Sequence, residues 1–249
     1  MSMLKDIIKR TLFLFGSYPN IYICKNPFKI YEFKEICRGI NFSGDEQILD
    51  IGCGSGFQSM IIGKRSRKIY GIDTSKKHIT SAKRLSHYMK ERIESEFRCI
   101  RIEDAQFENE FFDKILSICV FEHISNYDEV LREAYRILKK GGQMLFSVDS
   151  LETIEDNELL EKHKNDNFVE KYFKKEELQL FLKEIGFRHV EVYPILKSDF
   201  AKRLFVKGIN TKFRFGYLQS IIVSVILRYR DNLLTKKDKG IFLIAKCYK

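Results

Sequence analysis

The residues most able to support chemistry form a short loop, ILDIGCGSGF, over residues 48–57. Gly52 predicts a sharp turn out of a strand, and Gly54 and Gly56 allow the backbone to approach a ligand without interference from a Cβ atom. A helix expected from Gly56 onward adds free N–H groups and partial positive charge. This spacing predicts a binding loop between a strand and a helix.

The ligand of this loop is not expected to be a dinucleotide or a nucleoside triphosphate. A dinucleotide fingerprint reads G-x-G-x-x-G, whereas the third glycine here comes one residue early and Phe57 occupies its place. Asp50, two residues before Gly52, would repel a pyrophosphate, and no Gly-Lys-Ser/Thr follows to make a P-loop. The pattern favours a ligand that tolerates or attracts a nearby negative charge.

The segment LDIGCGSG resembles the first motif, D-x-G-x-G-x-G, of class I S-adenosylmethionine (SAM)-dependent methyltransferases. The resemblance continues through YGIDTS, IEDAQF, FDKILSICVFEHI and EVLREAYRILKKGGQMLFSV, and it covers about residues 45–148. It implies SAM as the cofactor. An acid near the loop then becomes reasonable, because SAM carries an ammonium group and a sulfonium.

The resemblance also implies a role for each position of the cofactor site. Asp50 and the glycine loop would contact the methionine end, Asp73 the ribose hydroxyls and Asp104 the adenine, while residues after the fourth strand would line the floor under the methyl group. Simpler structural roles stay open: Asp50 as a buried acid, Asp73 as a helix N-cap, Asp104 as a turn residue and Cys119 as packing only. The implied cofactor-binding residues are Asp50, Gly52, Cys53, Gly54, Gly56, Asp73, Thr74, Asp104, Ala105, Ile118 and Cys119.

A general base is expected in FEHI, residues 121–124, at the exit of the fourth strand. Methyl transfer from a sulfonium needs mainly alignment, so a base is required only for a hydroxyl or an acidic carbon. His123 is the predicted catalytic base and Glu122 its partner, since histidine titrates near neutrality and similar Glu-His pairs occur in the resembling quinone-biosynthesis and small-molecule methyltransferases. Alternatively, His123 only caps or packs the next segment. No metal site is predicted, because the six cysteines fit no zinc spacing.

The chain around these residues alternates between strand and helix patterns. Strands are predicted over residues 47–52, 67–73, 96–102, 112–120, 143–149, 187–195 and 240–248, and helices from Gly56 and over 75–93, 127–142 and 174–186. The alternation predicts an α/β, Rossmann-like sheet of mostly parallel strands with helices on both faces. The resemblance implies seven strands with an antiparallel last strand. Such folds bind ligands beyond the carboxyl ends of their central strands.

Two segments fall outside the alternation. We expect an N-terminal helical cap over residues 1–44, a SAM-binding core over 45–196, a basic and apolar insertion over 197–236, and a final core strand over 237–249. The cap opens with an amphipathic helix that is predicted to be a lid or a membrane-surface helix. Nothing at the N-terminus reads as a signal peptide, and the cysteines suggest a reducing compartment, so a cytoplasmic location, with peripheral membrane contact possible, is expected.

The insertion is the part of the chain that should select a partner. Thirteen basic and three acidic residues lie in 197–249, so this stretch carries the whole net charge of +10. The apolar run 218–227 is shorter than the roughly 20 residues that a membrane span needs. Interleaved basic and aromatic residues fit an anionic lipid surface or a lipid-linked acceptor, and also single-stranded nucleic acid. The alternative is a helical insertion that simply buries its apolar face.

The sequence predicts a SAM-dependent methyltransferase that acts on a small-molecule or a lipid- or glycan-linked acceptor at oxygen. Methylation of nucleic acid bases is disfavoured, because the fourth strand is followed neither by Asn/Asp-Pro-Pro-aromatic nor by a Pro-Cys nucleophile. An RNA or protein methyltransferase stays open. So does a non-catalytic SAM-binding module that docks a partner through its basic insertion.

Overall fold

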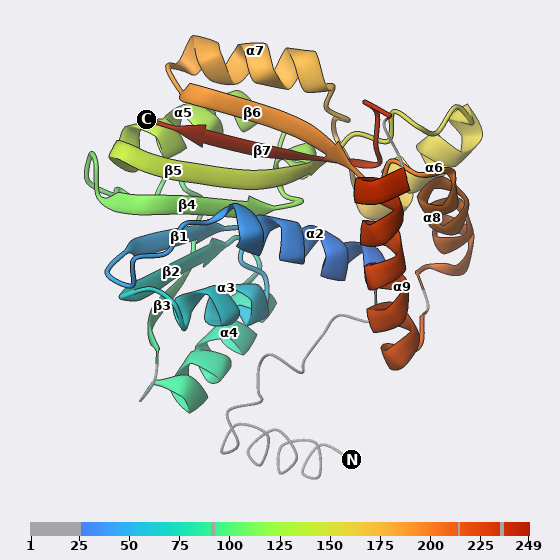
Figure 1. Ribbon diagram of the computed structural model, residues 1–249. Coiled ribbons are helices and arrows are strands. Elements are labelled where there is room, and N and C mark those ends of the chain that lie inside the picture. Colours follow the sequence, from blue (N-terminus) through green and yellow to red (C-terminus); the bar gives the residue numbers. More distant parts are fainter. Residues whose placement is uncertain (1–25, 91–92, 214, 235–236) are drawn as a thin grey trace.

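The computed structural model describes residues 26–249 except 91–92, 214 and 235–236 (Figure 1). The amphipathic helix predicted at the start of the chain therefore lies outside the described residues. The described part folds around one seven-stranded sheet with the strand order β3-β2-β1-β4-β5-β7-β6. The strands are β1 (Gln47–Ile51), β2 (Lys68–Asp73), β3 (Glu94–Cys99), β4 (Phe112–Ile118), β5 (Leu138–Asp149), β6 (Arg188–Ile195) and β7 (Phe242–Tyr248).

The sheet has the predicted mixture of directions. The pairs β1–β2, β1–β4, β2–β3 and β4–β5 are parallel, whereas β7 runs antiparallel to both β5 and β6. The predicted fold class, a Rossmann-like sheet with an antiparallel last strand, is confirmed. The order reverses at β1, whose neighbours are β2 and β4, and this is the place where open α/β sheets bind ligands.

Helices cover both faces of the sheet and so create two cores. One core packs α2 (Pro27–Gly39), α3 (Phe57–Gly63) and α4 (Lys76–Met89) against one face, and the other packs α5 (Tyr127–Ile137) and α7 (Lys175–Ile185) against the opposite face. Neighbouring strand residues alternate between these cores: Ile48 and Leu116 belong to the first, Leu49 and Ile115 to the second. Burial on both faces explains why the central strands are continuously apolar.

Three helices gather beyond the carboxyl ends of the parallel strands (Figure 1). They are α6 (Asn157–Asn167), α8 (Asp199–Thr211) and α9 (Tyr217–Tyr229), the last continuing into a π-helical turn, Arg230–Leu234. The segment predicted as an insertion contains α8 and α9, between β6 and β7. Phe28 of α2 packs edge-on against Phe205 of α8, with 5.1 Å between the ring centroids, and this contact joins α2 to the insertion.

Two predicted helix ends are wrong, because the helix predicted over 75–93 ends at Met89 and α5 is also shorter than predicted. The helix predicted over 127–142 ends at Ile137, and residues 138–142 belong to β5 instead. Strand pairing decides this, because Leu138 pairs with Phe112 and the Gly141 N–H donates to the Lys249 carbonyl at 2.9 Å. Local charge and glycine patterns favoured a helix end at Gly141, but neighbouring strands that lie far away in the sequence extend the sheet through it.

Candidate active site

The glycine loop is held against two neighbouring strands. Gly52 and Cys53 donate their N–H groups to the Ile72 carbonyl at 2.8 and 3.0 Å, and Gly52 and Gly54 have φ angles of +71° and +52°. A Cβ atom on Gly52 would lie 2.3 Å from Val120 Cγ2, whereas a Cβ on Gly54 would meet nothing within 4 Å. Gly52 is therefore fixed by packing, and Gly54 leaves bare backbone beside open space.

That open space is a cavity of about 750 Å³ at the carboxyl ends of β1 and β2. Its lining includes the predicted residues Gly52, Gly54, Asp73, Thr74, Cys119 and His123. It also includes residues 100–103, the turn after β3. A cavity of this size, with unobstructed backbone at Gly54 and the carboxylates of Asp73, Glu103 and Glu170 on its lining, fits a sulfonium nucleoside.

Asp73 supports this cavity from the end of β2. Its Oδ2 accepts a hydrogen bond from the Gly54 N–H at 2.9 Å, and its Oδ1 accepts one from the Ser75 N–H at 2.8 Å. The N-cap of α4 is Ser75 rather than Asp73, because the Ser75 Oγ accepts a hydrogen bond from the His78 N–H. Asp73 thus orders the loop while its side chain also borders the cavity.

Asp50 lies behind the loop, away from the cavity lining. Its side chain is buried, and its Oδ2 accepts a hydrogen bond from Ser59 Oγ at 2.5 Å. Burial, opposed by this hydrogen bond and reinforced by the nearby Asp73, raises the pKa of Asp50 to about 7. Within the described structure Asp50 therefore joins β1 to α3, and its predicted contact with the methionine end stays a prediction.

Asp104 also lies outside the cavity lining. Its half-exposed carboxylate accepts from Arg101 Nε at 2.9 Å, and Ala105 is buried in the core. The cavity wall on this side is made by Arg101, Ile102 and Glu103 instead. The remaining loop residues, Cys53 and Gly56, are likewise absent from the lining and shape the loop from behind.

The FEHI segment separates its two titratable side chains. Residues Phe121–His123 form a single 3-10 turn after β4, in which Phe121 packs into the core and Glu122 is fully buried. Neither carboxylate oxygen of Glu122 has a hydrogen-bond partner in the described part of the chain. His123 is exposed at the rim, with Nδ1 3.1 Å from the Phe168 carbonyl oxygen.

Glu122 faces a second cavity of about 320 Å³ that adjoins the first. Cys119, His123 and Asn167 line both cavities, so the two meet at the exit of β4. The predicted residue Ile118 lines the smaller cavity. The residues that complete its lining are Asn26, Lys29, Gln58, Asp149, His163, Phe205, Phe213 and Phe242.

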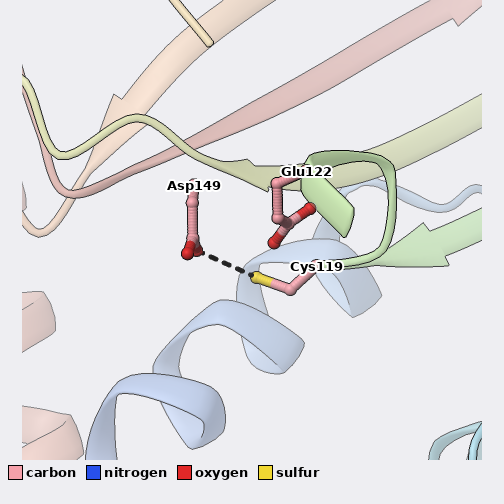
Figure 2. Close-up of side chains that lie close together, drawn as sticks. All are labelled: Cys119, Glu122 and Asp149. Carbon is pink, nitrogen blue, oxygen red and sulfur yellow. Dashed lines mark hydrogen bonds between the residues drawn. The ribbon is translucent and has the colours of Figure 1, made fainter. Parts of the chain in front are cut away.

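A cluster of ionisable groups surrounds this smaller cavity. Cys119 Sγ donates to Glu32 Oε1 at 2.7 Å and lies 3.6 Å from Asp149 Oδ1, while Lys29 Nζ lies 3.1 Å from Glu32 Oε2. Figure 2 shows Cys119, Glu122 and Asp149 converging from the β4 exit and the end of β5. One ligand atom of each of these three lies within 4.8 Å of the others, a spacing that also suits a metal ion.

Proton affinities in the cluster are shifted by burial and by neighbouring charge. Burial and the Asp149 carboxylate raise the pKa of Glu122 well above its usual value, and burial also raises the pKa of Asp149. Burial opposes the charge on Lys29, but Cys119, Glu32 and Asp149 together raise its pKa. The cluster can therefore hold and release a proton beside a bound molecule.

Sequence reasoning missed four members of this cluster: Lys29, Glu32, Asp149 and His163. Asp149 could have been found, because it ends a predicted strand as Asp73 does, and such ends face the ligand. Lys29 and Glu32 sit on α2, outside the alternating core, and only tertiary packing brings them to the cavity.

Comparisons with known proteins indicate a methyltransferase domain. Residues 49–146 match the family model described as "Methyltransferase domain". Ubiquinone biosynthesis O-methyltransferase of Bradyrhizobium diazoefficiens is 30% identical over 116 residues, covering 47% of this chain and 45% of the relative. The same-named enzyme of Pseudomonas putida is 34% identical over 103 residues, covering 41% and 44%. The chain thus matches less than half the length of these relatives.

Solved structures share the fold at low identity. The YcgJ protein of Bacillus subtilis has a TM-score of 0.59 at 18% identity, covering 88% of this chain and 98% of that protein. Phosphoethanolamine N-methyltransferase 2 of Haemonchus contortus, solved with SAM, has a TM-score of 0.63 at 20% identity, covering 87% and 52%. Residues 49–146 of this chain therefore form a methyltransferase domain, in agreement with the fold and with the glycine loop.

Proposed function

We propose that this protein transfers a methyl group from SAM to an oxygen of a small-molecule acceptor held in the 320 Å³ cavity, the acceptor cavity. The observation that carries the proposal is the Glu122 carboxylate on the lining of the smaller cavity, which is buried and has no hydrogen-bond partner in the described part of the chain. The curated relatives support the same acceptor atom, since they are named O-methyltransferases. The rival RNA and protein acceptors are less well supported, because the acceptor cavity is small.

A hydroxyl acceptor must lose a proton while its oxygen forms the new C–O bond. SAM, when bound, supplies a methyl group on a positively charged sulfur, which leaves as a neutral thioether. The Glu122 carboxylate accepts the hydroxyl proton at one of its free oxygens, and Asp149 beside it favours this protonated form. The protein walls exclude water and orient the acceptor oxygen toward the larger cavity.

His123 has a different place in this scheme from the one predicted. It lies at the rim of both cavities, with Nδ1 near the Phe168 carbonyl oxygen, so it suits proton exchange with solvent. We propose that Glu122 is the proton acceptor and that His123 returns the proton to water. Asp73 and the loop backbone would hold the ribose and methionine parts of SAM.

The first test compares Glu122→Gln with the exposed α6 variant Glu158→Gln. We expect Glu122→Gln to lower turnover about 10²–10⁴-fold because the amide cannot accept the proton, with little change in SAM affinity. Labelled SAM with small hydroxylated aromatic and sugar acceptors and fractionated cell extract gives the rate, and calorimetry gives the affinity. His123→Ala should lower turnover less, and Glu158→Gln should match the wild type.

Dialysis against EDTA tests whether Glu122 acts as the proton acceptor or as a metal ligand. We expect unchanged turnover, because the scheme moves the proton through the side chains of Glu122 and His123 and uses no metal ion. Loss of activity that is restored by a divalent cation would contradict the assignment and turn Cys119, Glu122 and Asp149 into metal ligands. Wild-type turnover in Glu122→Gln would equally remove its role.

The acceptor cavity also suits a molecule with an apolar part. Phe205 and Phe213, both from the insertion, and Phe242 of β7 form its apolar lining, and Phe242 lies against Lys29 of the ionisable cluster. We therefore include a lipid- or glycan-linked hydroxyl compound in the proposal, together with peripheral contact of the protein with an anionic membrane. No helix in the described part of the chain is long and apolar enough to cross a bilayer.

A further inference from the structure

Helix α9 buries polar residues and exposes apolar ones. Its inward positions Ser220, Ser224 and Leu227, together with Asp231 of the following turn, are at most 2% exposed. The serine hydroxyls donate to carbonyls of the helix and its N-cap, and Asp231 accepts from the backbone of residues 197 and 198. The small side chains of Ser220 and Ser224 let α9 lie close to α2 (Figure 1).

The outward side of α9 is a continuous apolar stripe. Six of the nine large exposed hydrophobic residues in the described part of the chain lie on this helix and its π-helical turn, with exposed fractions from 39% to 71%. Their spacing places them within about one third of the helix circumference. These residues, which we call the α9 stripe, are Leu218, Ile222, Val225, Ile226, Tyr229 and Leu233.

An ordinary surface helix has the opposite arrangement, so the α9 stripe needs a partner. Burying serines while exposing leucine and isoleucine leaves apolar area in water with no gain inside the fold. Contiguous apolar surface of this kind marks an interaction site. The structural alternative raised from the sequence, an insertion that buries its apolar face, therefore describes α8, which buries Phe205 and Ile209, but not the larger apolar face of α9.

Basic residues border the stripe. Lys34, Arg38 and Arg228 line a groove of about 350 Å³ between α2 and α9, next to Val225 and Leu233. Glu35 pairs with Arg38 and Arg228, whereas Lys34 has no ion pair with any described residue. The wider stretch 197–249 carries the whole excess of +10. The partner should therefore be apolar at its centre and anionic around it.

We propose that the α9 stripe lies on an anionic lipid surface, with the basic border at the headgroups. A second copy of the chain fits less well, because a two-fold interface would set the same basic borders against each other. Helix α8, which leads into α9, carries Phe205 of the acceptor cavity. Only the link between this surface and a lipid-linked acceptor rests on the proposed function. Docking on the lipid surface itself requires no methyl transfer.

Vesicle flotation of the full chain tests this surface. We expect binding to phosphatidylcholine vesicles that contain about one third phosphatidylglycerol, weaker binding to phosphatidylcholine alone, and loss of binding as salt rises. The combined variant Leu218→Gln, Ile222→Gln and Leu233→Gln should bind at least about tenfold more weakly. Because these side chains are exposed, the variant should melt like the wild type.

The matched control is Leu180→Gln, which changes an equally exposed leucine (60%) on α7, outside the stripe. It should bind vesicles like the wild type. The proposal is overturned if the wild type does not float, if the triple variant floats equally well, or if the control loses binding to the same degree. A lipid-free dimer abolished by the triple variant, with no flotation, would assign the stripe to self-association. A methyl-transfer assay with a water-soluble acceptor reports on the proposed function independently.

Discussion

Asp50 and Asp73 lie close together in the fold but have different surroundings. Asp73 lies at the edge of the larger cavity and accepts two backbone N–H groups. Asp50 lies one residue before the end of β1, and its buried carboxylate accepts a hydrogen bond from Ser59 Oγ. At the residue scale, Asp73 therefore faces the ligand cavity, whereas burial raises the pKa of Asp50 to about 7.

The raised pKa of Asp50 predicts a pH-dependent stability. Its folded pKa, about 7, exceeds the ordinary value of 3.8, so the folded state binds this proton more tightly than the unfolded chain. Its contribution is fully present below about pH 4 and is lost as the pH rises toward and through 7, by up to about 4 kcal/mol. Asp50→Asn should reduce this decline in unfolding free energy, measured by urea denaturation between pH 5 and 8.

The exposed variant Asp45→Asn provides the control for this measurement. It should keep the wild-type decline, because its carboxylate stays in water in both states. Glu122 and Asp149 also have raised pKa values, so the Asp50 variant should flatten the curve only in part. If the unfolding free energy of Asp50→Asn and of the wild type changed equally with pH, ionisation of Asp50 would cost the folded state no stability.

At the scale of elements, the cofactor loop is fixed by the turn that follows β4. Gly52 leaves β1 and meets Val120, which follows Cys119 and its positive φ of +50°. The same contact joins the backbone expected to hold the cofactor to the turn that carries Glu122. Packing between the two loops therefore sets where the two cavities meet.

Gly52→Ala should be more destabilising than Gly141→Ala. The two glycines have nearly equal φ angles, +71° and +74°, so backbone strain is matched. Only Gly52 meets a neighbour, since a Cβ there would lie 2.3 Å from Val120 Cγ2, while nothing lies within 4 Å at Gly141. We expect a further loss of about 1–3 kcal/mol in unfolding free energy.

Val120→Ala should recover part of that loss when it is combined with Gly52→Ala, because it removes the clashing methyl groups. Urea denaturation of the two single variants and the double variant gives the coupling energy. The prediction would be contradicted if Gly52→Ala and Gly141→Ala were equally destabilising, or if the effects of Gly52→Ala and Val120→Ala simply added. Either result would show that the loop shifts to accommodate the added Cβ atom.

At the scale of the molecule, both cavities lie where the strand order reverses, between β1 and β4. One is bordered by Gly54 and Asp73, the other by Glu122 and Asp149, and Cys119 lies on the lining of both. Elements from distant parts of the chain close the second cavity, namely α2, α6, α8 and β7. The parallel core thus supplies one binding region and the added helices supply the other.

The larger cavity predicts a selective thermal shift. S-adenosylhomocysteine at about 100 times its dissociation constant should stabilise the folded protein by about 2.7 kcal/mol, because it binds only the folded state. NAD at the same concentration should produce no shift, since the loop lacks the third glycine of a dinucleotide site. Differential scanning calorimetry measures both. Equal shifts, or none with S-adenosylhomocysteine, would contradict the assignment of this cavity.

Much of the fold and of the cofactor site was determined locally. Strand and helix periodicity, the loop glycines and Asp73 are short-range features, because the residues involved are neighbours in the chain or end adjacent strands. These features specified the sheet, its ligand-binding edge and a methyltransferase domain. Where local patterns conflicted with strand pairing, as at residues 138–142, the sheet prevailed.

The acceptor cavity and the docking face were decided only by the tertiary structure. Lys29 and Glu32 reach Cys119 and Asp149 through the packing of α2, and no spacing in the sequence records that approach. The sequence likewise showed an apolar helix in the insertion but not which side faces water. Burial depends on what packs against each element, and contacts between distant segments set it.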